Sequence, residues 1–116
     1  MKIISLDQVP SMPMMMAGAD GVTKQVPIGV ADGAPNFSFR VFTVIPGGHT
    51  PYHIHDSEHL NYVIQGDGVL VDESGNEHPV RAGEFALVTP NEKHQYRNTS
   101  MSEDLKMICA VPLDYE

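Results

Sequence analysis

The chain has little positive charge, one cysteine, no tryptophan and no long hydrophobic run. Its 116 residues include 7 Lys and Arg against 15 Asp and Glu, which gives a formal net charge of -8. Nucleic acids and anionic membranes both need clustered basic side chains, so neither is expected as a partner. The single Cys109 excludes an internal disulfide and a thiolate-rich zinc site. No apolar stretch approaches the roughly 20 residues of a transmembrane helix.

The length suits one domain with one modest hydrophobic core. Near the N-terminus the chain reaches Asp7 before any apolar stretch long enough for a secretory leader. We therefore expect a cytoplasmic protein that binds a small molecule.

Short apolar segments alternate with turn residues, and no long helical period is present, which is typical of an all-β protein. The predicted strands cover residues 37–45, 59–65, 69–71, 77–80, 85–88 and 105–111. Residues 46–48, Pro-Gly-Gly, are expected to end the first strand. Residues 66–68, Gly-Asp-Gly, are expected to form a hairpin turn. The pattern predicts a jelly-roll barrel or sandwich.

Four methionines stand among Pro, Ala and Gly in an N-terminal arm: Met12, Met14, Met15 and Met16. One interpretation is soft apolar packing over the barrel edge. The other is a contact between two chains or a lid over a pocket. The segments 3–6 and 22–28 are candidate edge strands for exchange with a second chain, because exposed edges favour pairing. We therefore expect a homodimer.

Three of the six histidines lie within seven residues: His53, His55 and His59. Residues two apart in an extended strand point to the same side, so His53 and His55 can bind one ligand. His59 can join them only if the chain bends between Asp56 and Glu58. Imidazole is the commonest metal ligand in proteins. The cluster therefore predicts a metal site held by nitrogen atoms.

Two motifs in the sequence resemble those of the cupin superfamily, whose members carry them on one small β-barrel. The matching residues are Gly47, His53, His55 and Gly66 in the first motif and Gly83, His94 and Asn98 in the second. His59 occupies the place of the family's glutamate, and Thr89 and Asn91 replace its proline and glycine. The resemblance implies an all-β cupin jelly-roll barrel, a single domain over 1–116 with an arm and edge strands in 1–30 and the barrel in 37–112.

The set of four histidines is similar to that of compact manganese-binding cupins, which are typically dimers. The resemblance implies one divalent transition-metal ion per chain, with Mn or Fe preferred and Zn, Ni or Cu as alternatives. Its ligands would be His53, His55, His59 and His94. Four neutral imidazoles leave the charge of the ion undiminished, whereas a glutamate cancels part of it. Such an ion is the stronger Lewis acid.

Three further residues are candidates for a catalytic role. Arg40, a charge in mid-strand among aromatic residues, points either outward or into a cavity, where it would bind a substrate carboxylate. Cys109 is either a small apolar filler or a redox-sensitive wall residue. Tyr62 has a phenolic hydroxyl to donate, but the sequence identifies no partner for it.

Three functions fit a metal site of this kind. The first is a dioxygenase or oxidase acting on a small anionic or enolisable substrate. The second is an isomerase or lyase in which the metal polarises a carbonyl oxygen. The third is a binding protein for a small ligand without catalysis. We rank the oxygenase first, but the fold serves many unrelated functions and the sequence leaves all three open.

Overall fold

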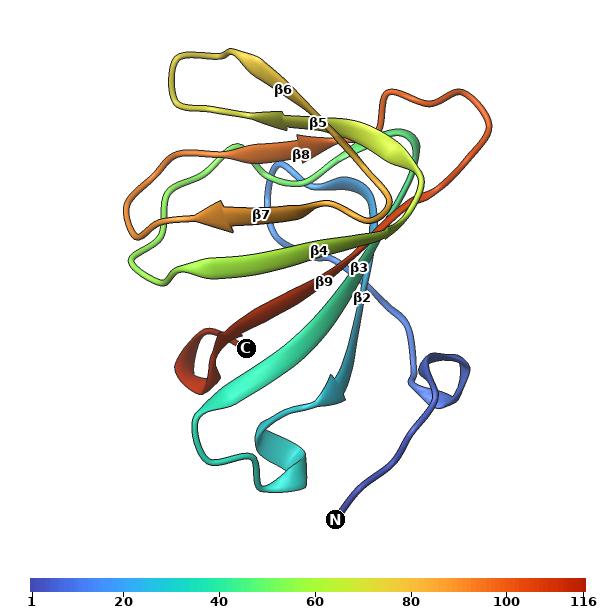
Figure 1. The fold of residues 1–116 in the computed structure, drawn as a ribbon, viewed down its shortest axis with the longest axis vertical. Coiled ribbons are helices and arrows are strands. Elements are labelled where there is room, and N and C mark those ends of the chain that lie inside the picture. Colours follow the sequence, from blue (N-terminus) through green and yellow to red (C-terminus); the bar gives the residue numbers. More distant parts are fainter.

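The structure is a computed structural model that describes all 116 residues. It is all-β, as predicted, and three single-turn 3₁₀ helices accompany the strands (Figure 1). The strands are β1 (Met12–Pro13), β2 (Asp20–Ile28), β3 (Phe37–His49), β4 (His59–Gln65), β5 (Asp67–Val71), β6 (Glu77–Arg81), β7 (Phe85–Val88), β8 (Gln95–Arg97) and β9 (Leu105–Pro112). The 3₁₀ helices are η1 (Leu6–Gln8), η2 (Val30–Asp32) and η3 (Leu113–Tyr115).

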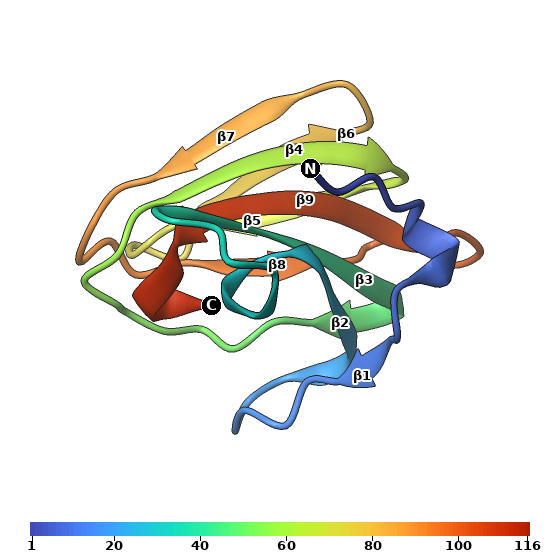
Figure 2. The same ribbon diagram turned by 90° about the horizontal axis from the view of Figure 1, so that it is seen from below.

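All strand pairs are antiparallel, and the main sheet has the order β6-β5-β8-β3-β9-β4-β7. β2 pairs with β3, and β1 pairs with β2 at the outer edge. The sheet curls around an interior, as the view from below shows (Figure 2). No helix in the structure has the length and apolar character needed to cross a membrane.

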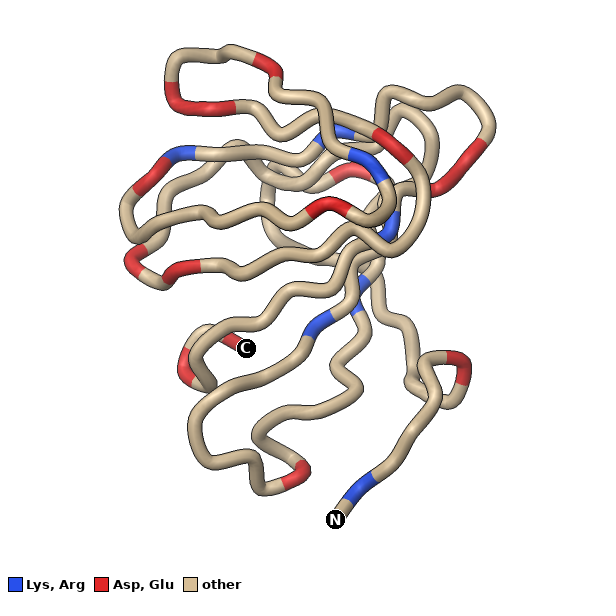
Figure 3. The backbone as a smooth tube through the Cα atoms, viewed as in Figure 1, with Lys and Arg blue, Asp and Glu red and all other residues tan.

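The hydrophobic core fills one part of this interior, because alternate residues of β3, β4 and β9 point inward. The core consists of Val22, Phe42, Val44, Val63, Tyr96, Leu105, Met107, Cys109 and Val111. Val44 and Leu105 are 0% exposed. Burying each such side chain contributes about 1.5–3 kcal/mol relative to leaving it in water. The acidic residues lie mostly in the turns and loops of the chain (Figure 3).

Two expected turns differ from the prediction: one does not end its strand, and the other separates two strands that do not pair with each other. β3 does not end at residues 46–48 but runs on to His49. Gly47 there has a φ of 78°, and a Cβ on Gly48 would lie 2.7 Å from the Asp20 carbonyl oxygen, so the glycines bend the strand instead of ending it. Residues 66–68 do not form a hairpin, because β4 pairs with β7 and β9 while β5 pairs with β6 and β8.

The N-terminal segment corrects a third expectation. Residues 3–6 form no strand, and Leu6–Gln8 is a 3₁₀ turn instead. The Gln25 side-chain amide on β2 donates hydrogen bonds to the carbonyl oxygens of Leu6 and Val9, both at 3.0 Å. These bonds attach the turn to the sheet without a strand ladder. The expected strand over 22–28 is confirmed as part of β2.

Candidate metal centre

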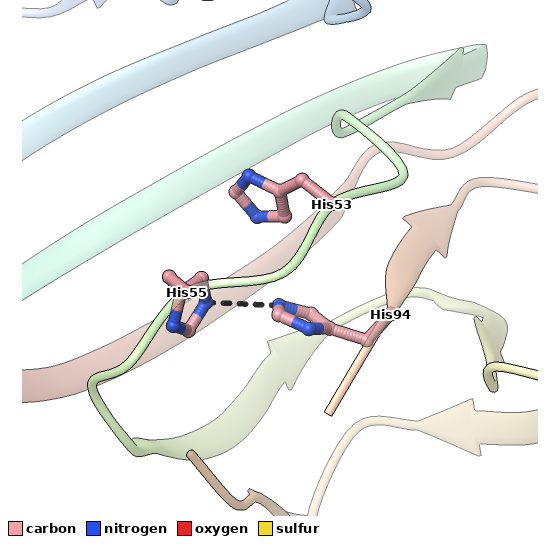
Figure 4. Close-up of side chains that lie close together, drawn as sticks. All are labelled: His53, His55 and His94. Atoms are coloured by element: carbon pink, nitrogen blue, oxygen red, sulfur yellow. Dashed lines mark hydrogen bonds between the residues drawn. The ribbon is translucent and has the colours of Figure 1, made fainter. Parts of the chain in front are cut away.

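His53 and His94 are placed opposite each other by the backbone. They form an isolated antiparallel bridge in which each amide donates to the other residue's carbonyl oxygen at 3.1 Å. Their ring centroids are 5.1 Å apart. His53 belongs to the segment between β3 and β4, and His94 comes just before β8 (Figure 4). Residues far apart in sequence thus meet at one point of the interior.

The bend that was expected to bring His59 toward the other histidines lies at Asp56 and Ser57, directly after His55. His55 is oriented by this segment. Its Nδ1 donates a hydrogen bond to the Ser57 carbonyl oxygen at 2.6 Å. In the same way His94 Nδ1 donates to the Glu92 carbonyl oxygen at 2.8 Å. A carbonyl oxygen only accepts, so these bonds place the proton of each ring on Nδ1 and leave Nε2 free.

The free Nε2 atoms of His55 and His94 lie 3.3 Å apart (Figure 4). Together with a nitrogen of His53 they form a group whose ligand atoms all lie within 4.8 Å of one another. Two lone pairs facing each other repel unless a cation lies between them. Nitrogen–metal distances of about 2.0–2.1 Å allow one ion to contact both atoms. The donor set of these three residues therefore fits a divalent transition-metal ion.

His59 is close to this group but engaged elsewhere. Its ring stacks on His55 with centroids 4.1 Å apart, and its centroid is 5.6 Å from that of His94. Its Nε2 lies 3.3 Å from Nη2 of Arg40. A guanidinium only donates hydrogen bonds, so His59 Nε2 acts as the acceptor. Ligation of the metal by His59 stays a prediction.

Burial keeps the four imidazoles neutral. Desolvation, with smaller contributions from neighbouring histidines, lowers the pKa of His53 to about 4. Desolvation and Arg40 lower the pKa of His59 to about 2. The pKa values of His55 and His94 are also lowered, chiefly by burial. Neutral imidazole is the form that binds metal, so the site is ready for an ion at pH 7.

Beside the histidines lies a cavity of about 540 Å³. Its apolar lining is rich in thioethers and includes Met12, Met14, Met15, Met16, Phe42 and Met107. Its polar lining includes Lys24, Arg40, Thr50, His53, His59, Asn61, His94, Tyr96, Cys109, Asp114, Tyr115 and Glu116. The methionine arm therefore lines a pocket, which matches one of the two interpretations of its sequence. Its role in contact between chains is untested.

Arg40 points into this interior and is 4% exposed. Its Nη2 donates to Cys109 Sγ at 3.1 Å, and its Nη1 donates to the Tyr115 carbonyl oxygen at 3.4 Å. The guanidinium also lies 4.9 Å from the Phe42 ring centroid. The ion pairs of the protein, Lys2–Asp32 and His78–Asp72, do not include it. The cavity thus contains a buried positive charge without a carboxylate partner.

The other two candidate catalytic residues lie on opposite faces of the sheet. Cys109 is 1% exposed and lines the cavity beside Arg40. Tyr62 is on the outer face, with its ring 4.5 Å from that of Phe85. The alternation from His59, which points inward, places Tyr62 outside. A catalytic role for Tyr62 therefore has no geometric support, and one for Arg40 or Cys109 stays a prediction.

Several residues of the cavity were not identified from the sequence, among them Asn61 and Tyr115. Asn61 lies two residues after His59 on β4 and shares its inward face, so the same alternation could have identified it. Tyr115 belongs to η3, and its ring lies 4.6 Å from that of His55 and 5.3 Å from that of His59. No motif in the sequence marks Tyr115, because only the fold brings this segment to the histidines. Glu58, the carboxylate next to His59 in the sequence, is exposed and does not line the cavity.

This chain belongs to the cupin family, since residues 40–111 match the family model described as the cupin domain. The match contains all four histidines as well as Arg40 and Cys109. Together with the curled sheet and the three-histidine group, it defines a cupin with a candidate metal site.

Among curated relatives, L-ectoine synthase of Mycolicibacterium gilvum is 26% identical over 110 residues, which cover 94% of this chain and 81% of the relative. Auxin-binding protein T85 of Nicotiana tabacum is 26% identical over 113 residues, but the match covers only 60% of that protein and 89% of this chain. Both likenesses extend well beyond the histidine motifs.

Among solved structures, the polyketide cyclase RemF from Streptomyces resistomycificus is similar, with a TM-score of 0.92 and 29% identity. The likeness covers 97% of this chain and 80% of RemF. A predicted oxalate decarboxylase from Thermotoga maritima matches with a TM-score of 0.83 at 22% identity, which is a likeness of fold alone. It covers 97% of this chain and 99% of that one.

Proposed function

We propose that the protein is a metal-dependent cupin enzyme that activates an enolisable carbonyl substrate without O₂, in a cyclisation or related dehydration. The observation that carries the proposal is the cavity of about 540 Å³, whose lining combines three histidines (His53, His59 and His94), Arg40 without an ion-pair partner, and five methionines. Such a space suits an apolar molecule with a few oxygen atoms at one end. The likeness to a polyketide cyclase and to L-ectoine synthases supports the non-redox reaction.

His53, His55 and His94 would hold the ion, and we propose His59 as the fourth ligand. The bound ion supplies Lewis acidity that polarises a carbonyl oxygen of the substrate. His59 Nε2 lies against Arg40. When His59 turns toward the other histidines, Arg40 loses that acceptor and its Nη2 is free for a substrate oxygen. Arg40 Nε has no hydrogen-bond partner in the protein, so it would be available to a substrate oxygen whether or not His59 is a ligand.

The remaining residues of the cavity orient the substrate and exclude water. The thioethers of the methionine arm and Met107 form an apolar, deformable wall, which suits a flexible carbon chain. Arg40 would hold an enolate or carboxylate oxygen, since charge-assisted hydrogen bonds are the stronger ones. The Tyr115 ring covers His55 and His59, and so limits the entry of water from the side of η3.

The dioxygenase or oxidase stays a competing proposal, because open metal positions next to a substrate anion also suit O₂ chemistry. It requires O₂ to be consumed during turnover, which the cyclisation does not. A binding protein without catalysis is the third possibility and requires tight binding with no product in any metal form.

The test begins with elemental analysis of the purified protein, followed by reconstitution with Mn, Fe, Zn, Ni or Cu. Each form is incubated with aromatic 1,3-dicarbonyl and 1,3,5-tricarbonyl compounds, with and without O₂. We expect loss of one water from a substrate at equal rates in both atmospheres, as measured by mass spectrometry. The matched controls are His94→Ala, which should be inactive, and His78→Ala, an exposed histidine that should not matter. Turnover that stops without O₂ would reject the cyclisation and support the oxygenase.

A further inference from the structure

Three buried side-chain atoms have no hydrogen-bond partner in the protein: Arg40 Nε, Asn61 Oδ1 and the Tyr96 hydroxyl. Each of the three residues is 4% exposed, and all three line the same cavity. Native proteins pair the large majority of such atoms. Three exceptions that share one cavity indicate that the missing partners belong to a ligand.

The sheet brings these groups together. Arg40 on β3 is paired in register with Cys109 on β9, which is paired with Asn61 on β4. Neighbouring strands are about 4.8 Å apart, so Arg40 and Asn61 flank Cys109 on the inner face. Tyr96 on β8 belongs to the same core cluster as Cys109 and lines the same cavity. We call Arg40, Asn61 and Tyr96 the polar subsite.

The chemistry of the three atoms restricts what can bind there. Arg40 Nε donates only, and no carboxylate forms an ion pair with the guanidinium, although Asp114 and Glu116 line the same cavity, so an anionic oxygen of a ligand is its best-matched partner. Asn61 Oδ1 accepts only, so it requires an O–H or N–H donor on the ligand. The Tyr96 hydroxyl can do either. A carboxylate with a hydroxyl group on the adjacent carbon supplies both kinds of atom within a small space.

We infer that the polar subsite binds the carboxylate end of a 2-hydroxy or enolic acid, while the remainder of the molecule extends toward the histidines and the methionine wall. This inference deepens the proposed function by naming the substrate class, and it rests on that function only for the other end of the ligand. The carboxylate would bind Arg40, and the neighbouring hydroxyl would donate to Asn61.

The test uses protein freed of metal by a chelator, so that no probe can bind through the ion. The probes, titrated by calorimetry, are 3-phenyllactate, 3-phenylpropanoate, which lacks the hydroxyl, and 3-phenyllactamide, which lacks the charge. We expect 3-phenyllactate to bind most tightly. The amide should bind roughly tenfold more weakly or worse, because bonds to a charged partner are the stronger ones.

The variants assign these differences to single residues. Arg40→Met should remove the preference for the acid over the amide, and Asn61→Leu should remove the preference for the hydroxyl. Tyr96→Phe keeps the shape of the site and should weaken 3-phenyllactate binding without unfolding the barrel. Arg81→Met removes an exposed arginine, changes the net charge equally and should leave all three affinities unchanged.

Equal affinity for acid and amide, absence of binding to the metal-free protein, or an Arg40→Met variant that keeps the preference would overturn the inference. Arg40→Lys is the second variant if Arg40→Met does not fold. Lysine keeps the positive charge but lacks the Nε donor of arginine. The Arg40→Lys variant should therefore bind 3-phenyllactate more weakly and keep part of the preference for the acid over the amide. Because no turnover is measured, these results stand apart from the test of cyclisation. An intact subsite in a protein without cyclase activity would reject only the proposed function.

Discussion

Across the strands β3, β9, β4 and β7, one row of inward residues beside the histidines is more polar than the outward row next to it. One row across the inner face consists of Arg40, Cys109, Asn61 and Ala86. The next row, one residue along each strand and on the outer face, consists of Phe39, Ala110, Leu60 and Leu87. Sheets that cover a core usually turn apolar residues inward and polar residues to water.

The polar residues of the inward row are explained by the candidate metal centre, because Arg40, Asn61 and Cys109 line the cavity beside the histidines. The outer face has no such explanation within one chain. Phe85, Leu87, Leu60 and Phe39 are 81%, 56%, 52% and 48% exposed. A contiguous apolar surface of this kind is typical of an interface between proteins. We propose that a second copy of the chain covers it, so that one face serves chemistry and the other serves assembly.

The largest effect is expected at the inner face. The double variant His53→Ala/His94→Ala removes two of the three nitrogen atoms that lie together. Metal affinity should fall by at least about 100-fold, because even the residues that only orient a ligand are worth 10–100-fold. Elemental analysis and a competitive chelator titration measure this. His78→Ala is the matched control, and unchanged metal content in the double variant would reject the site.

The second prediction tests the outer face alone, with substitutions that do not touch the cavity. Leu60→Glu/Phe85→Glu places two carboxylates on the apolar surface, where association would bury them without a partner. We expect the dimer dissociation constant to rise by at least about 100-fold, with no change in metal content. Light scattering over a concentration series measures the mass.

Val30→Glu is the control for the outer face, because Val30 is 58% exposed in η2 and lies outside these strands. It should leave the dimer intact. A wild-type protein that is monomeric at all concentrations would contradict the assignment of this face.

The alternation of side chains along β3 was readable from the sequence, and it placed Arg40 with Ser38, Phe42 and Val44 on one face. The sequence did not say which face was inside, because an arginine among aromatic residues fits either side. Only the pairing of β3 with β9 and the position of His59 decide it. The resemblance of the histidine motifs to those of cupins predicted the fold, and these motifs contain the three histidines that the structure brings together.

The features that the sequence did not predict depend on contacts between residues far apart in the chain. The strand β8 has only three residues, too few for a pattern, and exists because the Gln95–Arg97 segment pairs with β5. Gly66 looks like a hairpin turn in sequence, but its φ of 80° carries the chain across the barrel. A Cβ there would lie 2.2 Å from the Asp104 carbonyl oxygen, a contact that no local pattern records.

The third prediction concerns the unpaired charge of the inner face. Arg40→Met should raise the free energy of unfolding by about 1–4 kcal/mol, because apolar replacements of buried charged groups are often stabilising by this amount. The same variant should lose the preference for a carboxylate ligand. Urea unfolding of the metal-free protein measures the first effect. A loss of stability would show that the contacts of Arg40 with Cys109 and Tyr115 outweigh its desolvation.

The smallest expected effect is a fall in the free energy of unfolding at acid pH. It should arise from the histidines of the inner face and leave dimerisation through the outer face unchanged. Burial lowers the pKa of His53 to about 4, with His94, His55 and Arg40 as the charged or titratable neighbours that add to the shift. Between the ordinary pKa near 6.5 and this value, the unfolded chain binds a proton that the folded chain does not. The free energy of unfolding of the metal-free protein should therefore fall as the pH is lowered from 6.5 toward 4.

The apolar rows of the outer face contain no group that titrates in this range. The dimer should therefore persist while the free energy of unfolding falls. Urea unfolding and light scattering at pH 7, 6 and 5 measure the two properties on the same metal-free samples. His53→Gln should reduce the pH dependence, because it removes one of the groups that protonates only on unfolding. A dimer that dissociates in parallel with the loss of stability would show that the two faces are coupled through the strands they share.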